Sequence, residues 1–97
     1  MNTSKTLHLS VELLTSPYGT PIPTLRARGD ASVHYREFSA TLHELAAKAE
    51  RATPRIESWC VTRDRDGDTV GRISIDVARG DAREVEAAMA MLNALAK

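Results

Sequence analysis

Apolar and polar residues alternate at the start of the chain. From Leu7 to Leu13 every odd position is apolar, while His8, Ser10 and Glu12 lie between. A period of two predicts a strand with one buried face. Three of the four prolines follow within residues 15–23. Because proline fixes φ and lacks an N–H donor, this segment is expected to form a loop that cannot continue a paired central strand.

A short strand over residues 24–28, with Leu25 and Ala27 on one face, precedes a helical pattern. Apolar or small residues recur at spacings of three and four from Ala31 to Ala52, which indicates a helix capped by Asp30. In the alternative interpretation, residues 31–36 form a strand and the helix begins after Ser39 as the cap. We favour the longer helix, and in both cases Pro54 ends it.

Two strands are expected next, over residues 56–63 and 69–78, joined through the acidic segment 64–68. A two-residue turn would place Trp59 on the polar face of this hairpin. A three-residue loop with a glycine bulge places Trp59 opposite Ile73 on the apolar face, and leaves the other face polar. The second register is favoured because it gathers the apolar side chains on one side.

The last element is a helix expected over residues 82–97. Asp81 is followed three residues later by Glu84, which resembles a capping box. One helical stripe behind this start holds the apolar residues Val85, Ala88, Met89, Leu92 and Leu95.

The predicted fold is therefore α+β, an antiparallel sheet with two helices on one face in the order ββαββα. The pentapeptide Ala-Arg-Gly-Asp-Ala occurs at residues 27–31 and 78–82, each time at the expected end of a strand and cap of a helix. Together with the repeated strand, strand, helix order, it suggests a degenerate duplication of a ββα unit.

Length and composition limit the classes of protein to consider. Ninety-seven residues with 42% hydrophobic content indicate one domain over residues 1–97. Thirteen basic and thirteen acidic residues give no net charge, which argues against general binding to nucleic acid or to an anionic membrane. The single cysteine, Cys60, and the lack of a long apolar run indicate a cytoplasmic protein without a leader or membrane span.

The residues that carry metal or catalytic chemistry do not occur in productive patterns. Asp64, Asp66 and Asp68 resemble the start of a calcium loop, but Gly67 precedes the third aspartate and Ile75 stands where the closing glutamate belongs. An acidic hairpin tip explains them better. No metal site is therefore expected.

Nucleophilic and phosphate-binding signals are also missing. His8, His34 and His43 have no ligand partner at metal-binding spacing, and Cys60 lies in the middle of an expected strand. The five glycines do not form a phosphate-binding loop. These patterns predict a protein with no enzymatic activity and no cofactor.

The last helix departs most from the pattern of a solvated helix. Its face away from the apolar stripe carries Ala87, Ala90, Met91 and Ala94, where charges are usual. Such a helix has to be covered by the sheet, by the first helix or by another polypeptide. Tyr18, on the proline-rich segment, is a second candidate contact.

The functional prediction is a non-enzymatic protein–protein interaction module. It would act as a homodimer or as a small modulator or inhibitor of a larger protein partner, through the last helix and Tyr18. The alternative is a nucleic-acid-binding regulator that uses arginines on the sheet face. The arginines that would carry it are Arg26, Arg28, Arg63 and Arg72.

Overall fold

The computed structural model describes residues 7–30, 33–52, 55–63 and 69–96. Its elements follow the predicted order ββαββα, with one additional short 3₁₀ helix. Their bounds are β1 Leu7–Thr15, β2 Pro21–Gly29, α1 Tyr35–Ala52, β3 Ile56–Arg63, β4 Thr69–Ile75, η1 Ala78–Gly80 and α2 Ala82–Ala96.

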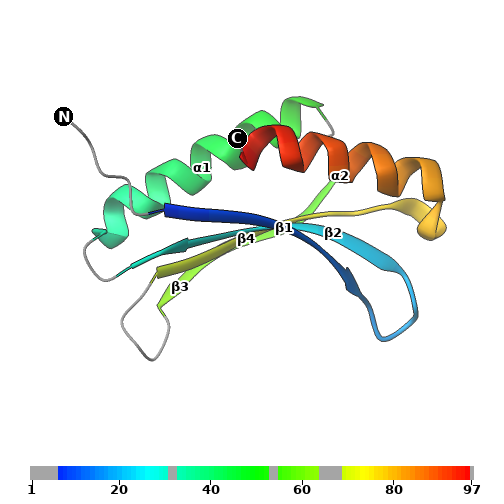
Figure 1. Ribbon diagram of the computed structural model, residues 1–97, viewed down its shortest axis with the longest axis horizontal. Helices are drawn as coiled ribbons and strands as arrows, with labels where there is room; N and C mark the ends of the chain where they lie inside the picture. Colours follow the sequence, from blue (N-terminus) through cyan, green and yellow to red (C-terminus); the bar gives the residue numbers. More distant parts are fainter. Residues whose placement is uncertain (1–6, 31–32, 53–54, 64–68, 97) are drawn as a thin grey trace.

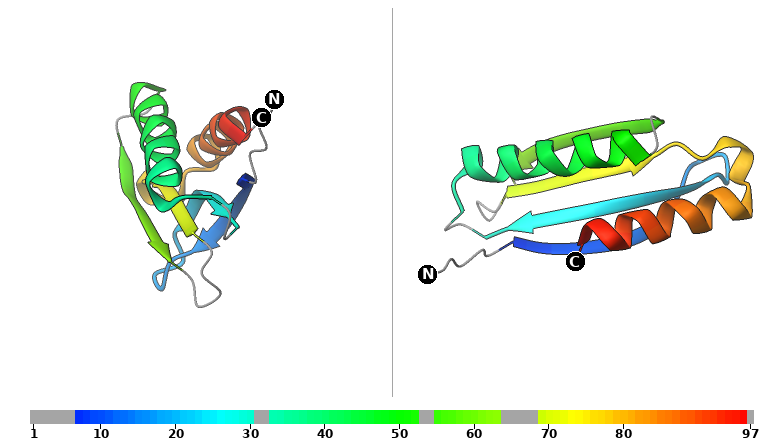
Figure 2. Two further views of the ribbon diagram at one scale, coloured as in Figure 1. Left: turned by 90° about the vertical axis from the view of Figure 1, so that its left-hand side faces the viewer. Right: turned by 90° about the horizontal axis from the view of Figure 1, so that it is seen from above.

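The four strands form one antiparallel sheet in the order β1-β2-β4-β3. Both helices lie on the same face of this sheet and run in opposite directions (Figure 1, Figure 2). The fold class and the placement of both helices on one face are confirmed. Each half of the molecule is a hairpin followed by a helix, and the second strand of each hairpin lies in the centre of the sheet.

The core lies between the sheet and the two helices. The strands contribute Leu25 and Ile73, while α1 contributes Phe38 and Leu42 and α2 contributes Leu92, all at most 1% exposed. Removing such side chains from water is the main favourable term in folding. The predicted inward positions of the central strands and of both helices are therefore confirmed at these residues.

The register of the second hairpin is also confirmed. Trp59 pairs with Ile73 and Val61 with Gly71, as the three-residue loop requires. Along β4, Ile73 and Ile75 are buried, whereas Arg72 is exposed. The connecting segment 64–68 and the side chain of Trp59 lie outside the described residues.

The first hairpin differs from the prediction at its prolines. Pro21 and Pro23 do not lie in a loop but form the first part of β2, where they pair with Thr15 and Leu13 of β1. The pairing of β2 with β4 covers only residues 24–29. Prolines are tolerated here because this part of β2 has one hydrogen-bonded neighbour instead of two.

The end of β1 also departs from the expected burial. The alternation of Leu7, Leu9 and Val11 holds, since all three pack partly buried against the core. Leu13 was expected on the buried face but is 49% exposed. The apolar face of β1 therefore extends further than the part covered by the core.

Both predicted starts of the first helix are wrong. The helix α1 begins at Tyr35, and the His34 carbonyl accepts its first hydrogen bond, from the Phe38 amide at 3.0 Å. The Asp30 carbonyl instead accepts from the Val33 amide. Asp30 cannot begin the helix because β2 continues to Gly29 in the centre of the sheet, and the chain has to leave the sheet before it enters the helix layer.

The second helix begins as predicted. Asp81 caps α2, because its Oδ1 accepts the Arg83 amide at 2.8 Å. The predicted capping box does not close, since the Glu84 carboxylate accepts the Ala78 amide at 3.0 Å instead of the Asp81 amide. The Asp81 amide donates to the Ala78 carbonyl. The 3₁₀ turn η1 therefore takes over the role that the capping box would have had.

Candidate protein-binding surface

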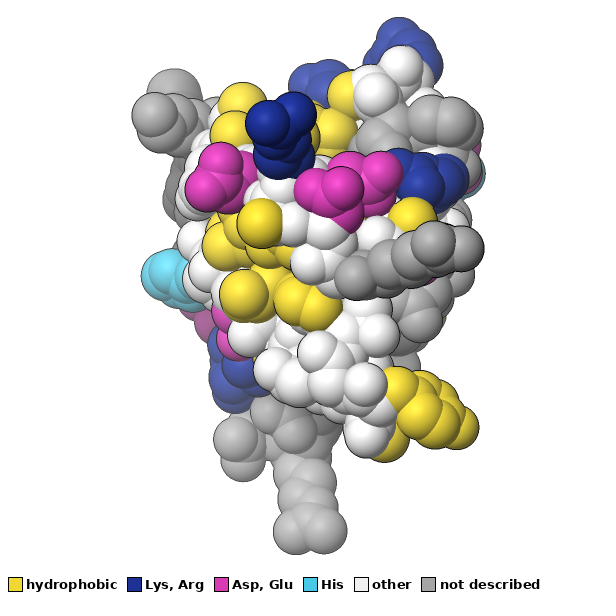
Figure 3. Space-filling view, turned by 90° about the vertical axis from the view of Figure 1, so that its right-hand side faces the viewer, with side chains coloured by type: hydrophobic (Ala, Val, Ile, Leu, Met, Phe, Trp, Pro, Cys, Tyr) yellow, Lys and Arg dark blue, Asp and Glu magenta, His cyan; other side chains and the backbone are white. Residues whose placement is uncertain are grey.

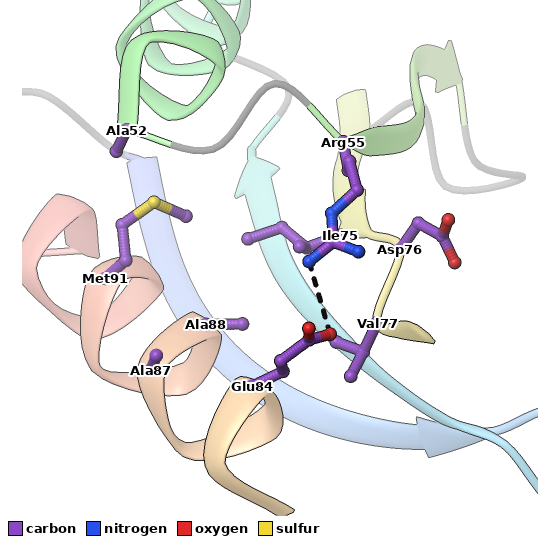
Figure 4. Close-up of a pocket in the computed structure, with 9 residues that line it drawn as sticks. All are labelled: Ala52, Arg55, Ile75, Asp76, Val77, Glu84, Ala87, Ala88 and Met91. Atoms are coloured by element: carbon purple, nitrogen blue, oxygen red, sulfur yellow. Dashed lines mark ion pairs between the residues drawn. The ribbon is translucent and has the colours of Figure 1, made fainter. Parts of the chain in front are cut away.

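A groove opens between the C-terminal end of α1, the end of β4 and the first turns of α2 (Figure 4). Its volume is about 210 Å³, which is enough for a large apolar side chain. The lining residues are Ala52, Arg55, Ile75, Asp76, Val77, Glu84, Ala87, Ala88 and Met91. Ile75, Val77 and Ala88 belong to the core, so the groove reaches down to the apolar interior.

One ion pair stands at this groove. Arg55 Nη2 lies 3.2 Å from Glu84 Oε2, with the two side chains 48% and 37% exposed (Figure 4). At this exposure the pair adds little to stability. Glu84 also holds the Ala78 amide, so the carboxylate fixes the start of α2 as one border of the groove.

The predicted interface residues of α2 lie on its outer side. Ala87, Ala90 and Ala94 are exposed, and Met91 is partly buried against the core. Ala87 and Met91 also line the groove. The four residues Ala87, Ala90, Met91 and Ala94 form what we call the α2 surface, and it is continuous with the groove.

Tyr18 lies apart from the helices, at the turn between β1 and β2. Its side chain is 94% exposed. The Ser16 hydroxyl accepts the amides of Tyr18 and Thr20 at 3.2 and 3.0 Å, and the Gly19 amide donates to the Ser16 carbonyl. These bonds give the turn a defined shape that presents the tyrosine to solvent.

Sequence reasoning missed two other apolar residues near this turn. Leu13 is 49% exposed and Leu14 is 37% exposed. Adjacent leucines at the end of a strand point to opposite faces, so at least one of them had to lie outside the core. This alternation was the signal in the sequence.

Figure 3 shows hydrophobic side chains gathered in the middle of this end of the molecule, with acidic and basic side chains on their border.

Three of the four candidate arginines, Arg26, Arg28 and Arg72, alternate along β2 and β4 with residues buried against the helices. They therefore belong to the sheet face that the helices leave open (Figure 2). Arg26 of β2 is directly opposite Arg72 of β4, and Arg28 lies two residues along the same strand. The Nε atom of Arg26 is buried and has no hydrogen-bond partner among the described residues. The side chain of Arg63 lies outside the described residues.

Within the described ranges, no three His, Cys, Asp or Glu side chains converge to hold a metal ion. His8, His34 and His43 are all exposed. The acidic segment 64–68 and the side chain of Cys60 are outside these ranges. Among the helices described, none is long and apolar enough to cross a membrane.

Comparison of the chain with protein-family models, curated proteins and solved structures gives no match.

Proposed function

We propose that this protein is a non-enzymatic protein–protein interaction module that binds through the α2 surface. It would act as a homodimer or as a small modulator or inhibitor of a larger protein. The observation that supports this proposal is the run of exposed alanines on α2 that leads, through Met91, into an apolar groove. Alanines allow a partner backbone to approach closely, and the groove offers space for an apolar anchor.

The polar border of the groove supports the same function. Arg55, Asp76 and Glu84 stand around an apolar floor, which is the arrangement of a small interface with a dry centre and a wet rim. Both signs of charge are present there, so the rim would select a partner with matching charges rather than attract any polyanion.

The test is a substitution that the fold tolerates. Ala94→Glu places a charge on an exposed position of α2, whereas Met91→Glu would also disturb a side chain packed against the core. Ala40→Glu, on the exposed side of α1, is the matched control. Tagged wild-type and variant chains are compared by light scattering and by capture of the untagged chain or of cellular proteins.

We expect Ala94→Glu to lose at least one complex that both the wild type and Ala40→Glu form. If Ala94→Glu keeps every such complex at wild-type strength, the assignment of the α2 surface is overturned. Circular dichroism of both variants establishes that the fold is intact, so that lost binding is not lost structure.

A second candidate function is supported by the arginines on the open sheet face. Like charges directly opposite each other in a sheet are unfavourable unless an anion lies between them, and Arg26 and Arg72 occupy such positions. Phosphate groups of a nucleic acid are anions of this kind. This candidate is a nucleic-acid-binding regulator that uses Arg26, Arg28 and Arg72.

Fluorescence anisotropy with labelled single-stranded and double-stranded oligonucleotides, from low to high salt, tests this candidate. Each phosphate contact should contribute about one unit to the slope of log affinity against log salt, so Arg72→Ala should lower the slope by about one. Arg83→Ala, an exposed arginine on α2, is the control. Lack of binding at low salt would rule the candidate out.

A further inference from the structure

The strand β1 forms one edge of the sheet and pairs only with β2 among the described strands. Its pairing is regular over all nine residues, from Leu7 with Gly29 to Thr15 with Pro21. The outward N–H and C=O groups of such a strand are a template for another strand. An edge of this length therefore needs either protection or a partner.

The two edges of the sheet differ in protection. The pairing of β3 with β4 shifts between Ile56 and Ser58, and such an irregularity discourages the addition of a further strand. The strand β1 has no irregularity, proline, lysine or arginine, and its one acidic residue is Glu12. Of the usual devices that prevent edge pairing, β1 itself carries only the one charged side chain of Glu12.

The sequence of β1 is complementary to itself in one antiparallel register. With Ser10 opposite Ser10 of a second copy, Leu7 faces Leu13 of that copy and Leu9 faces its Val11. On the other face of the sheet, His8 then faces Glu12 of the second copy. Every apolar residue from Leu7 to Leu13 meets an apolar residue, and the half-exposed Leu13 is covered.

The neighbouring registers are less favourable. Centring the pair on Glu12 places two carboxylates directly opposite each other, which destabilises a sheet. Centring it on Val11 places His8 opposite Leu14 of the second copy and leaves Glu12 opposite Ser10. Both the charges and the apolar row therefore select the register that is centred on Ser10.

The helix layer is compatible with this pairing. The helix α2 packs on β1 and β2 (Figure 2), so a two-fold axis beside β1 brings the two α2 helices together on one face. Both α2 helices of such a pair would cover the same face of the joined sheet, and the other face would stay open.

We propose that β1 is a self-association edge, at which a second copy of this chain adds its own β1 in antiparallel orientation, centred on Ser10, to form one continuous sheet. The inference goes beyond the proposed function, because it names a second copy as the partner of a surface other than the α2 surface. Either proposal can fail without the other.

The first experiment measures molar mass by sedimentation equilibrium over a concentration series. The wild type is expected to dimerise to twice the chain mass of 10.6 kDa. Glu12→Lys and His8→Glu each place like or unmatched charges in two symmetric pairs, so each should weaken the dimer about tenfold. The double variant places a glutamate at position 8 opposite a lysine at position 12 of the second copy, an oppositely charged pair, and should return the dissociation constant to within about threefold of the wild type.

Thr62→Lys, at an exposed position of the opposite edge strand β3, is the matched control and should leave the dimer unchanged. A wild type that stays monomeric at the highest concentration overturns the proposal. So does a dimer that both β1 single variants leave intact. If Ala94→Glu is the only variant that dissociates the dimer, the chain self-associates through the α2 surface. The proposal for β1 is then overturned as well.

The second experiment tests the register without relying on charge. Directly opposite residues of antiparallel strands have Cα atoms about 4.5–5.5 Å apart, within the range that a disulfide spans. In a Cys60→Ser background, Ser10→Cys should therefore form a covalent dimer on mild oxidation, and Thr62→Cys should not. Equal cross-linking of the two variants, or none with Ser10→Cys, contradicts the Ser10-centred pair.

Discussion

The same five residues, Ala-Arg-Gly-Asp-Ala, occur at 27–31 and 78–82 and form different structures. In the first pentapeptide, Ala27, Arg28 and Gly29 complete the central strand β2. In the second, Ala78, Arg79 and Gly80 form the 3₁₀ turn η1. A local sequence that is identical therefore takes its conformation from its neighbours.

The neighbouring strands account for the difference. Gly29 pairs with Leu7 on one side and Thr69 on the other, so both neighbours extend β2 to its end. Beyond Ile75, β4 has no described ladder partner, since its pairing with β2 ends at Thr24 and Ser74. The chain is then free to tighten into η1, and Asp81 caps α2 directly.

The glycines of the two pentapeptides are needed for different reasons. A Cβ atom on Gly29 would lie 2.8 Å from Phe38 Cδ2 and 3.3 Å from Leu7 Cδ2. Gly80 has a φ of +66°, which L side chains rarely adopt, and its Cβ would lie 3.0 Å from Pro21 Cδ. The first glycine makes room for a core side chain, while the second permits a left-handed backbone.

The largest effect on stability is expected at the core aromatic ring that contacts the first of the two glycines. Phe38 is 1% exposed and packs against Gly29, so Phe38→Ala should lower the free energy of unfolding by about 3–5 kcal/mol. Urea denaturation followed by circular dichroism measures this loss. A loss below about 1 kcal/mol would mean that α1 is not anchored by this ring.

The next effect is at the first glycine itself. Gly29→Ala should cost about 1–3 kcal/mol because the added methyl overlaps the Phe38 ring. The cost should fall when Phe38 is replaced by the smaller Leu, since the clash is with that ring. The four proteins of this double-mutant cycle are compared by urea denaturation, and equal costs in both backgrounds would contradict the contact.

A smaller effect is expected at the second glycine, with a different dependence on side chain. Gly80→Ala should cost about 1–2 kcal/mol, because alanine is strained at positive φ. Asn tolerates this conformation better than alanine, so Gly80→Asn should cost less. At Gly29, where space is limiting, Asn should be no better than Ala. If the Ala and Asn variants rank in the same order of cost at both sites, the two glycines are not needed for different reasons.

The comparison also explains how far the sequence could predict the fold. The β3–β4 register and the start of α2 depend on residues close in sequence, and both were predicted correctly. The favoured start of α1 was predicted wrongly, because Asp30 was expected to cap this helix as Asp81 caps α2. Nothing in the pentapeptide reveals that β2 is central and continues to Gly29, since that depends on pairing with β4.

The residues of the candidate surfaces also differ in whether the sequence could predict their positions. Helical periodicity placed Ala90 and Ala94 on the outer side of α2, where both are exposed. The meeting of Arg55 with Glu84 and of Arg26 with Arg72 joins segments that are far apart in the chain. No local pattern marks such pairs. The sequence alone therefore proposed Arg26 and Arg72 without placing them opposite each other, and it did not indicate Arg55 at all.

The smallest effect on stability is expected at the aspartates of the two pentapeptides, Asp30 and Asp81. Asp81 accepts the Arg83 amide at the start of α2, so Asp81→Ala should cost about 1 kcal/mol, whereas Asp81→Asn keeps an equivalent cap and should cost little. Asp30 is not at the cap of α1, which begins at Tyr35. The difference between its Ala and Asn variants should therefore be smaller than at Asp81. Thermal denaturation of the four variants measures both differences, and if they are equal, capping does not distinguish the two pentapeptides.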